Sequence, residues 1–259
     1  GGDAIMIGTN AIEKGIILPE TQNHLNYDIS NSMFSNESEP CDYQYGLSGT
    51  LSLMIGFAIG LPPLWDIENG SSRIGVFGLM DQGSNNGRGV VPSPPDPWTR
   101  IYAGWELPTI IDNNSEVSLP KVSKNNVARV NINESEYFLI ENRINHFRKG
   151  VSLDSIRFKV WEETDMYPSF ISSLKDSVEI EQDDNGVITK IPNYDIGLPG
   201  SGILIWHIDE EKIQQGIDDY SINKLVSLPG IDIEEADGAQ DIGQQSFFMF
   251  NDPSSGYFG

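Results

Sequence analysis

The side chains best suited to binding a ligand are the carboxylates in one short run near residue 235. Asp232, Glu235, Asp237 and Asp241 belong to this run, and Gly238 allows a sharp turn within it. Carboxylate oxygens are the ligands that calcium prefers, although the run lacks the spacing of an EF-hand loop. The run therefore predicts either a structural calcium site or an acidic turn that is closed by its own hydrogen bonds.

Histidine is the other residue type that could carry chemistry, and the chain has three, at His24, His146 and His207. His207 and Asp209 stand two residues apart in a predicted strand, so their side chains face the same way. An aspartate can fix the tautomer of a neighbouring imidazole, which then donates a hydrogen bond to a developing negative charge. The pair is a candidate catalytic pair, and the alternative is a structural hydrogen-bonded pair at a strand end.

A mainly apolar stretch from Leu51 to Ile59 predicts one helix around which the rest of the chain is organised. Gly60 follows it, and then Pro62 and Pro63, which cannot continue a helix. Apolar side chains occupy nearly every side of this helix, so it is expected to be buried all round.

Beyond Ile110 the chain changes to short apolar or alternating runs separated by turns, which predicts a β-rich part. The expected strands are 117–119, 127–132, 136–142, 155–161, 202–209 and 231–235. The sequence thus favours an α+β fold in which strands that follow the helix carry His207 and the acidic run.

Several strings, in this order along the chain, resemble the immune-inhibitor-A family of secreted bacterial zinc metallopeptidases. They are the helix ending in Gly60-Leu-Pro62, Val76-Phe-Gly-Leu-Met-Asp-Gln-Gly83, Glu136-Tyr-Phe-Leu-Ile-Glu-Asn-Arg143, Ser201-Gly-Ile-Leu-Ile-Trp-His-Ile-Asp-Glu210 and Glu235-Ala-Asp-Gly238. The resemblance covers residues 49–245 well and residues 1–48 poorly.

In that family the helix reads H-E-x-x-H-x-x-G-L-P, where two imidazoles hold a zinc ion and the glutamate polarises the metal-bound water. The resemblance places Leu53 and Phe57 at the histidine positions and Met54 at the glutamate position. None of these side chains can bind zinc or move a proton. The resemblance therefore implies a degenerate member, a pseudoenzyme with no catalytic residue at these positions and no zinc.

The resemblance also implies roles for residues outside the helix. Met80 takes the position of a methionine turn beneath the metal, and plain core packing is the alternative. Asp66 or Glu68 could stand where the family has its third, acidic ligand, but one carboxylate without imidazole partners does not hold zinc usefully. In an active relative, His207 and Asp209 could serve the oxyanion of peptide hydrolysis.

The fold implied by the resemblance is a zincin-like, metallopeptidase-like subdomain with a buried former active-site helix, followed by a β-rich subdomain. Residues 1–48 are expected to form a poorly matched N-terminal segment and residues 49–110 the degenerate zincin-like helix and methionine-turn region. Residues 111–259 are expected to form the β-rich C-terminal part of the peptidase-like domain, in truncated form.

The chain is strongly acidic, with 38 acidic against 16 basic residues and a formal net charge of -22. This charge argues against a nucleic-acid partner, because phosphates require Lys and Arg. The single cysteine, Cys41, cannot form an internal disulfide, and the sequence has no apolar run of about 18 residues that would span a membrane. Together with the resemblance, the acidity predicts a secreted or cell-surface bacterial protein.

Three functions remain open from the sequence. The first is a non-catalytic binding, assembly or structural role, with an unknown protein partner or the other domains of a longer precursor. The second is an active zinc-dependent endopeptidase with relocated ligands, which would need one of the three histidines near Asp66. The third is a calcium-binding structural module in which acidic loops brace the β-rich part.

Overall fold

A computed structural model describes most of the chain from Ser48 to Ile242. The described residues are 48–86, 89, 91–111, 116–119, 126–148, 151–165, 180–182, 184, 188–191, 193–225, 229–238 and 242. The strands expected near residues 4–8 and 15–19 therefore lie outside the described residues, as does His24.

The described part contains helices and strands in mixed order. The helices are α3 (Ser48–Ala58), η2 (Gly75–Phe77), η3 (Gln82–Asn85), α4 (Pro97–Tyr102), α5 (Leu153–Thr164), η4 (Tyr194–Gly197) and α7 (Glu210–Gly216). The strands are β1 (Thr109–Ile110), β2 (Ala128–Asn131), β3 (Glu136–Arg143), β4 (His146–Arg148), β5 (Val151–Ser152), β6 (Glu181–Gln182), β7 (Ile188–Lys190), β8 (Gly202–Asp209) and β9 (Ile231–Ile233). No helix in this part of the chain is long and apolar enough to cross a membrane.

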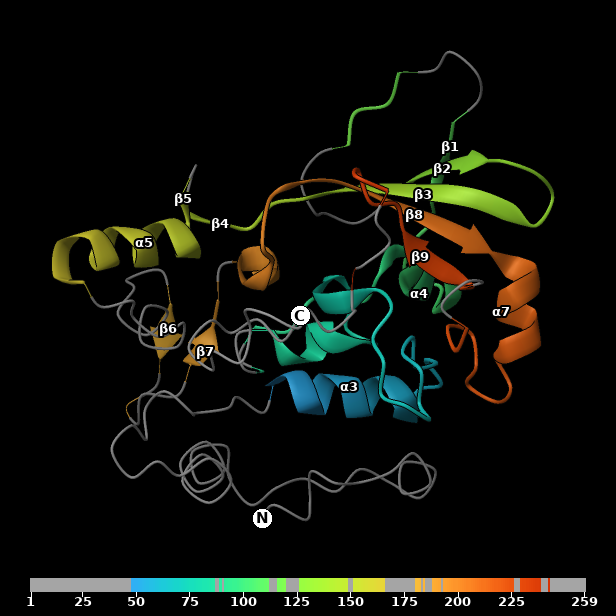
Figure 1. Cartoon of the computed structure of the whole chain (residues 1–259), viewed down its shortest axis with the longest axis horizontal. Coiled ribbons are helices and arrows are strands. Elements are labelled where there is room, and N and C mark those ends of the chain that lie inside the picture. Colours follow the sequence, from blue (N-terminus) through green and yellow to red (C-terminus); the bar gives the residue numbers. More distant parts are fainter. Residues whose placement is uncertain are drawn as a thin grey trace.

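A five-stranded mixed sheet with the order β1-β2-β3-β8-β9 is the main β element, so the predicted α+β class is confirmed. The β1–β2 pair is parallel and the other pairs are antiparallel. Strands β3 and β8 pair along their whole length, from Glu136 opposite Asp209 to Arg143 opposite Gly202. Figure 1 shows this sheet along the upper side of the molecule and α3 on the opposite side, with the short helices between them.

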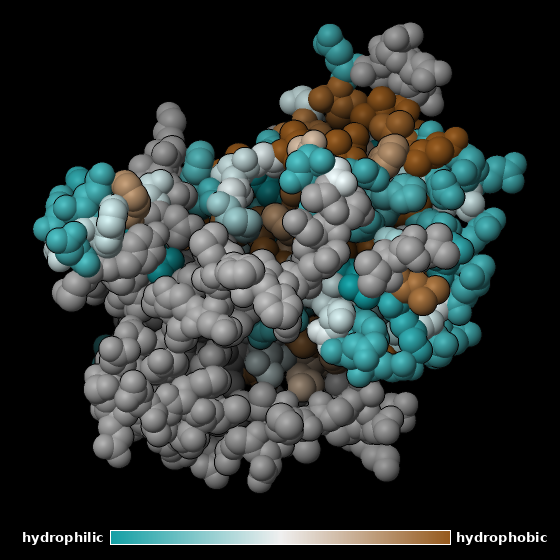
Figure 2. All heavy atoms as spheres, viewed as in Figure 1, coloured by the Kyte–Doolittle hydropathy of each residue, from teal (hydrophilic) through white to brown (hydrophobic). Residues whose placement is uncertain are grey.

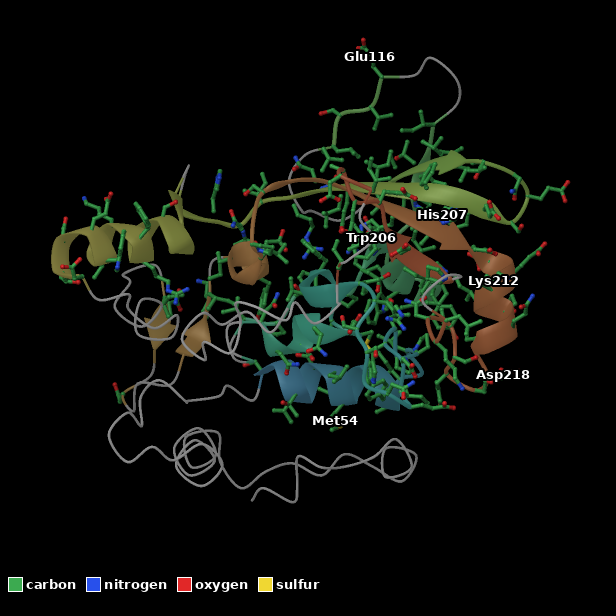
Figure 3. All side chains as sticks on the ribbon, in the orientation of Figure 1. Met54, Glu116, Trp206, His207, Lys212 and Asp218 are labelled. Carbon is green, nitrogen blue, oxygen red and sulfur yellow. The ribbon has the colours of Figure 1, made fainter. Side chains whose placement is uncertain are left out.

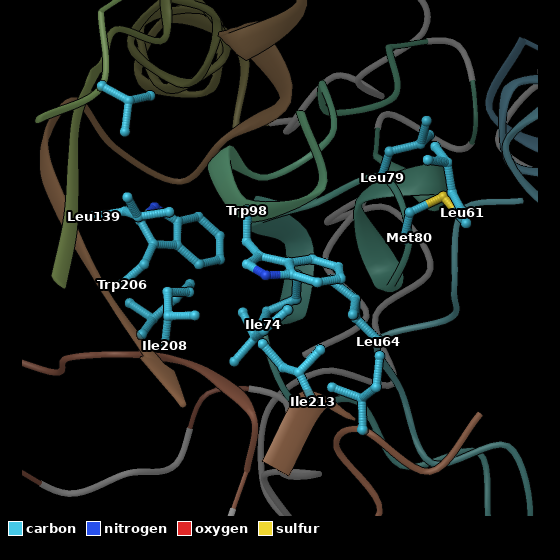
Figure 4. Close-up of a cluster of buried hydrophobic side chains, with 14 of the residues drawn as sticks. Leu61, Leu64, Ile74, Leu79, Met80, Trp98, Leu139, Trp206, Ile208 and Ile213 are labelled. Atoms are coloured by element: carbon cyan, nitrogen blue, oxygen red, sulfur yellow. The ribbon is translucent and has the colours of Figure 1, made fainter. Parts of the chain in front are cut away.

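One hydrophobic core lies beneath the sheet and joins segments from both sides of residue 110. Trp206 of β8 and Leu139 of β3 lie in this core together with Trp98 of α4 and with Met80, which lies between η2 and η3 (Figure 4). All four side chains are buried. The core therefore fixes α3 and the loop after it relative to the sheet, while the proposed domain boundary at 110 stays a prediction.

Four of the six strands predicted after Ile110 are confirmed. Strands β2, β8 and β9 fall within the predicted ranges 127–132, 202–209 and 231–235, and β3 covers the predicted range 136–142 and extends one residue further, to Arg143. The strand predicted at 117–119 is wrong, because β1 occupies the place beside β2 at this edge of the sheet.

The strand predicted at 155–161 is also wrong, since these residues belong to α5. Short apolar runs do not distinguish strand from helix by periodicity alone, and here the helix extends through Glu162 and Glu163. Phe158 and Trp161, three residues apart, have their ring centroids 5.4 Å from each other, which is the neighbour spacing of a helix.

Candidate functional site

The candidate site is built on α3, which carries Leu53, Met54 and Phe57 at the positions implied by the resemblance. The helix is not buried all round, which corrects the prediction from its composition. Ile55 is 48% exposed and Ile59 is 57% exposed, whereas Leu53 and Phe57 pack against the core. One stripe of α3 thus faces the protein, and apolar residues on the other side of the helix are left at the surface.

Two glycines on the inner stripe bring the backbone of α3 close to its neighbours. Gly49 and Gly56 are buried and seven residues apart, which places them on the same side of a helix. The Gly49 N–H donates to the carbonyl oxygen of Gly89 at 2.8 Å. At Gly56, a Cβ atom would lie 2.8 Å from the sulfur of Met80, so the missing side chain makes room for this methionine.

Met80 lies against α3 at Gly56 and is fully buried. Its carbonyl oxygen accepts a hydrogen bond from the Leu64 N–H at 2.9 Å. This bond links the loop that directly follows α3 to the turn between η2 and η3. This packing agrees with the expectation that Met80 fills the core. Whether its loop also serves as a methionine turn beneath a metal stays a prediction.

The three side chains that the resemblance places at the two histidine positions and the glutamate position present carbon and sulfur atoms only. Phe57 contacts Trp65, with ring centroids 5.7 Å apart and an interplanar angle of 62°. Leu53 lies on the same inner stripe, and Met54 lies on the side of α3 that faces away from the sheet (Figure 3). Neither imidazole nor carboxylate chemistry can take place at these three side chains.

The two carboxylates considered for a third ligand have structural partners. Asp66 is buried and accepts hydrogen bonds from the Glu68 N–H and from the Asn69 Nδ2 group, both at 2.9 Å. The hydrogen bond from the Asn69 side chain is the main cause that holds the pKa of Asp66 below its ordinary value. Glu68 forms an ion pair with Lys224 at 2.5 Å. Asp66 therefore stabilises a turn, and Glu68 is paired across the surface.

His207 and Asp209 lie on the same side of β8, but the Asp209 carboxylate is engaged elsewhere. It caps α7 by accepting hydrogen bonds from the Glu211 and Lys212 N–H groups at 3.0 and 3.1 Å. The His207 Nε2 atom is 3.9 Å from a carboxylate oxygen of Glu136, and its ring lies 5.6 Å from that of Phe138. The geometry gives Asp209 a structural role, and a catalytic role for the pair stays a prediction.

The predicted calcium ligands are spread over β9 and the turn that follows it. Burial raises the pKa of Asp232 on β9, and Glu235 accepts a hydrogen bond from the Ile242 N–H at 2.8 Å. Gly238 has a φ of 71°, as expected for the sharp turn, while Asp241 lies outside the described residues. The described residues contain no group of three or more His, Cys, Asp or Glu side chains that could hold a metal ion. Calcium binding therefore stays a prediction.

Beside Met80, the Asp81 carboxylate holds a loop together from within the protein. It accepts hydrogen bonds from the backbone N–H groups of Arg73, Ile74 and Gln82 at 2.8, 2.9 and 2.8 Å. Burial nevertheless raises the pKa of Asp81 from 3.8 to about 6. The loop that supports α3 is therefore stabilised by a group that changes charge in mildly acidic solution.

We expect Asp81 to make the free energy of unfolding depend on pH. Because the folded-state pKa is raised, its contribution to stability is full below about pH 3.8 and decreases as the pH rises through about 6. A rise of this size corresponds to about 3 kcal/mol. Urea unfolding of the wild type and of Asp81→Asn between pH 4 and 7 isolates this group, since asparagine does not titrate. A stability difference that does not vary with pH would contradict the assignment.

A buried network of charges, which the sequence analysis missed, lies between α4, β3 and η4. Arg143 binds Asp195 at 2.6 Å and Glu141 at 3.1 Å. Arg100 joins the same Glu141 at 2.9 Å to Glu106 at 2.5 Å. We call these five residues the buried charge network. It consists of three carboxylates and two guanidinium groups, and all three carboxylates are buried.

Within the buried charge network, opposite charges keep Glu141 and Arg143 ionised despite their burial. Burial opposes the ionisation of Glu141, yet the guanidinium groups of Arg143 and Arg100 hold its pKa below the ordinary value. The Trp206 Nε1–H group also donates to Glu141 at 3.2 Å. Burial likewise opposes the ionisation of Arg143 by lowering its pKa, but the carboxylates of Glu141 and Asp195 raise that pKa above the ordinary value. The network therefore ties the centre of the sheet to α4 and η4.

Helix α4 places Arg100 in this network through well-defined ends. Asp96 caps its start by accepting a hydrogen bond from the Thr99 N–H at 2.9 Å, and Pro97 occupies the first turn. At the other end Gly104 has a φ of 72°, and the Trp105 N–H donates back to the Arg100 carbonyl oxygen at 2.9 Å. This is the hydrogen bond of a Schellman motif, which stops the helix so that the chain returns with Glu106 inward.

A comparison of the chain with protein-family models, with curated proteins and with solved structures finds no match.

Proposed function

We infer that this chain is a metallopeptidase-like domain without a zinc site, which serves a non-catalytic binding, assembly or structural role outside the cell. The observation that supports this most is the environment of Leu53 and Phe57. Both side chains pack against the core, on the stripe of α3 that also holds Gly49 and Gly56. At these positions α3 contributes packing, where the resemblance would require metal ligands.

The surroundings of α3 support the same function. Asp66 and Glu68, the acids nearest in sequence, are engaged in a turn and in an ion pair. Among the described residues, His146 belongs to β4 and His207 to β8, and neither is part of a group of potential metal ligands. The strong negative charge of the chain and its resemblance to secreted peptidases support a location outside the cell. No described feature favours the active-peptidase or calcium-module alternatives over this one.

We expect the purified protein to contain no stoichiometric zinc and to show no chelator-sensitive hydrolysis of casein or of a peptide library. The physical reason is that leucine, methionine and phenylalanine offer no lone pair that competes with water for zinc. Elemental analysis after dialysis against zinc-containing buffer measures the first property directly. The variant Ile55→His, at an exposed position of the same helix, controls for loosely bound surface zinc. Stoichiometric zinc in the wild type would refute the proposal.

A further inference from the structure

The strands at the centre of the sheet are apolar on both sides, which is unusual for an antiparallel sheet with one face in solvent. On β8 the side chains of Trp206 and Ile208 point into the core, while Ile203 and Ile205 point to the other face. Strand β3 repeats this pattern, with Phe138 and Ile140 directly opposite His207 and Ile205. A strand with this composition is expected to be covered on both faces.

The residues on the outer side form one continuous surface, which we call the outer sheet face. Cross-strand partners lie within about 5 Å of one another, so neighbours in register are in contact. The apolar members of this surface are Val130, Phe138, Ile140, Ile203 and Ile205. Ile203 is 55% exposed and Ile205 is 37% exposed. In Figure 2, apolar residues gather over the upper part of the molecule, where Figure 1 places β1, β2, β3 and β8.

One end of the outer sheet face is acidic. Glu136 and Asp209 are partners in register there, and Asp232 stands opposite His207 on the next strand. Among the strand positions that share this face, His207 is the only side chain that can become positively charged. The surface therefore combines an apolar centre with a negative border, which is complementary to an apolar patch flanked by positive charge.

The charge distribution argues against two other occupants of this face. A second copy of the chain would bring the same three carboxylates together, and each copy already carries a formal net charge of -22. A membrane surface with anionic lipids would be repelled by the same border. The apolar centre also has no row of donors or acceptors that would orient a polar small molecule.

We propose that the outer sheet face is a docking surface for a protein partner whose apolar contact side chains are flanked by Lys or Arg. The Ile and Phe side chains would supply the buried centre of the interface, and the carboxylates of Glu136 and Asp232 would set its orientation and its salt dependence. This inference rests on the proposed function, in which the chain acts by binding and not by hydrolysis. It adds which surface of the chain binds and what chemistry the partner's surface has.

The experiment uses an amphipathic peptide of leucine and lysine as probe and measures its binding to the whole chain by fluorescence anisotropy. We expect the double variant Ile203→Thr/Ile205→Thr to weaken binding by about tenfold or more, because threonine keeps the strand propensity but removes the apolar contact. The matched control is Ile55→Thr/Ile59→Thr, in α3 and directly after its end, which changes two similarly exposed isoleucines and leaves the net charge unaltered. This control should bind as the wild type does.

A second pair of variants tests the acidic border. The variant Glu136→Gln/Asp232→Asn should weaken binding and reduce its salt dependence. The control Glu162→Gln/Glu163→Gln, at exposed positions of α5, removes the same charge and should do neither. The proposal would be overturned if the two isoleucine pairs had equal effects on binding. It would also be overturned if sedimentation showed a dimer that Ile203→Thr/Ile205→Thr dissociates, or if the chain bound tightly to anionic vesicles. These results are independent of zinc content, so either proposal can fail while the other holds.

Discussion

Replacement of Arg143 by methionine is expected to lower the free energy of unfolding by about 3–5 kcal/mol. Arg143 is buried and makes two hydrogen bonds to Asp195, from Nε at 2.9 Å and from Nη2 at 2.6 Å. Methionine fills part of the space but removes both hydrogen bonds from Arg143. Of the donors to the Asp195 carboxylate described here, only the Ile144 N–H remains. Burying a charge without its partner is costly, whereas the intact pair contributes little net stability.

Urea unfolding followed by circular dichroism measures this loss, and two variants make the result specific. Lys224→Met breaks the exposed ion pair with Glu68 and should change stability far less than Arg143→Met does, because water and salt screen this pair. Asp195→Asn introduced together with Arg143→Met removes the orphaned charge and should recover about 1–2 kcal/mol. If Arg143→Met were as mild as Lys224→Met, the Asp195 carboxylate would not be buried against Arg143 as described above.

The sequence predicted the sheet well because its strands are marked by composition. Residues 203–206 form an unbroken apolar run within β8, and this pattern is typical of a strand that is covered on both sides. Residues 155–161 instead alternate between polar and apolar side chains but form a helix, since so short a pattern fits both periods and the continuation of the helix decided between them. The local pattern thus identified strands such as β8 correctly. It failed for residues 155–161, which belong to a helix longer than the pattern itself.

The buried charge network shows what single-sequence reasoning leaves out. Glu141 and Arg143 continue the inward positions of β3 after Tyr137 and Leu139, and this period of two was a usable signal for their burial. Their partners could not be predicted, because Asp195 lies 52 residues further along the chain. An ionised residue is compatible with a core only when such a distant partner is present, and only the three-dimensional arrangement supplies it.

Helix α3 illustrates the opposite case, in which composition predicted too much burial. Its hydrophobic residues are distributed all around, yet the side that packs is selected by shape, through Gly49 and Gly56. Small residues allow a close approach of backbones, and large apolar residues at Ile55 and Ile59 then remain outside. The spacing of the two glycines, seven residues apart, was the signal in the sequence that could have identified the inner stripe.

Gly49→Ala is expected to lower the free energy of unfolding by about 3 kcal/mol or more, although alanine is a better helix former than glycine by about 1 kcal/mol. The reason is steric. A Cβ atom at Gly49 would lie 1.8 Å from the backbone carbonyl oxygen of Ser84, and 3.2 Å from the Cα of Gly89. Neither neighbour is the mobile end of a side chain, so the clash can be relieved only by moving α3 away from η3.

Two further glycines test whether this steric explanation is correct. Gly56→Ala places its Cβ 2.8 Å from the sulfur of Met80, a flexible side chain that can turn aside, so the loss should be smaller, about 1 kcal/mol. Gly200→Ala meets nothing within 4 Å and should be neutral or stabilise the protein by about 0.4–1 kcal/mol. Denaturant unfolding of the three variants should therefore rank Gly49→Ala as the most damaging. The reverse order would mean that α3 is held by its leucine and phenylalanine side chains and not by the contact of its backbone with η3.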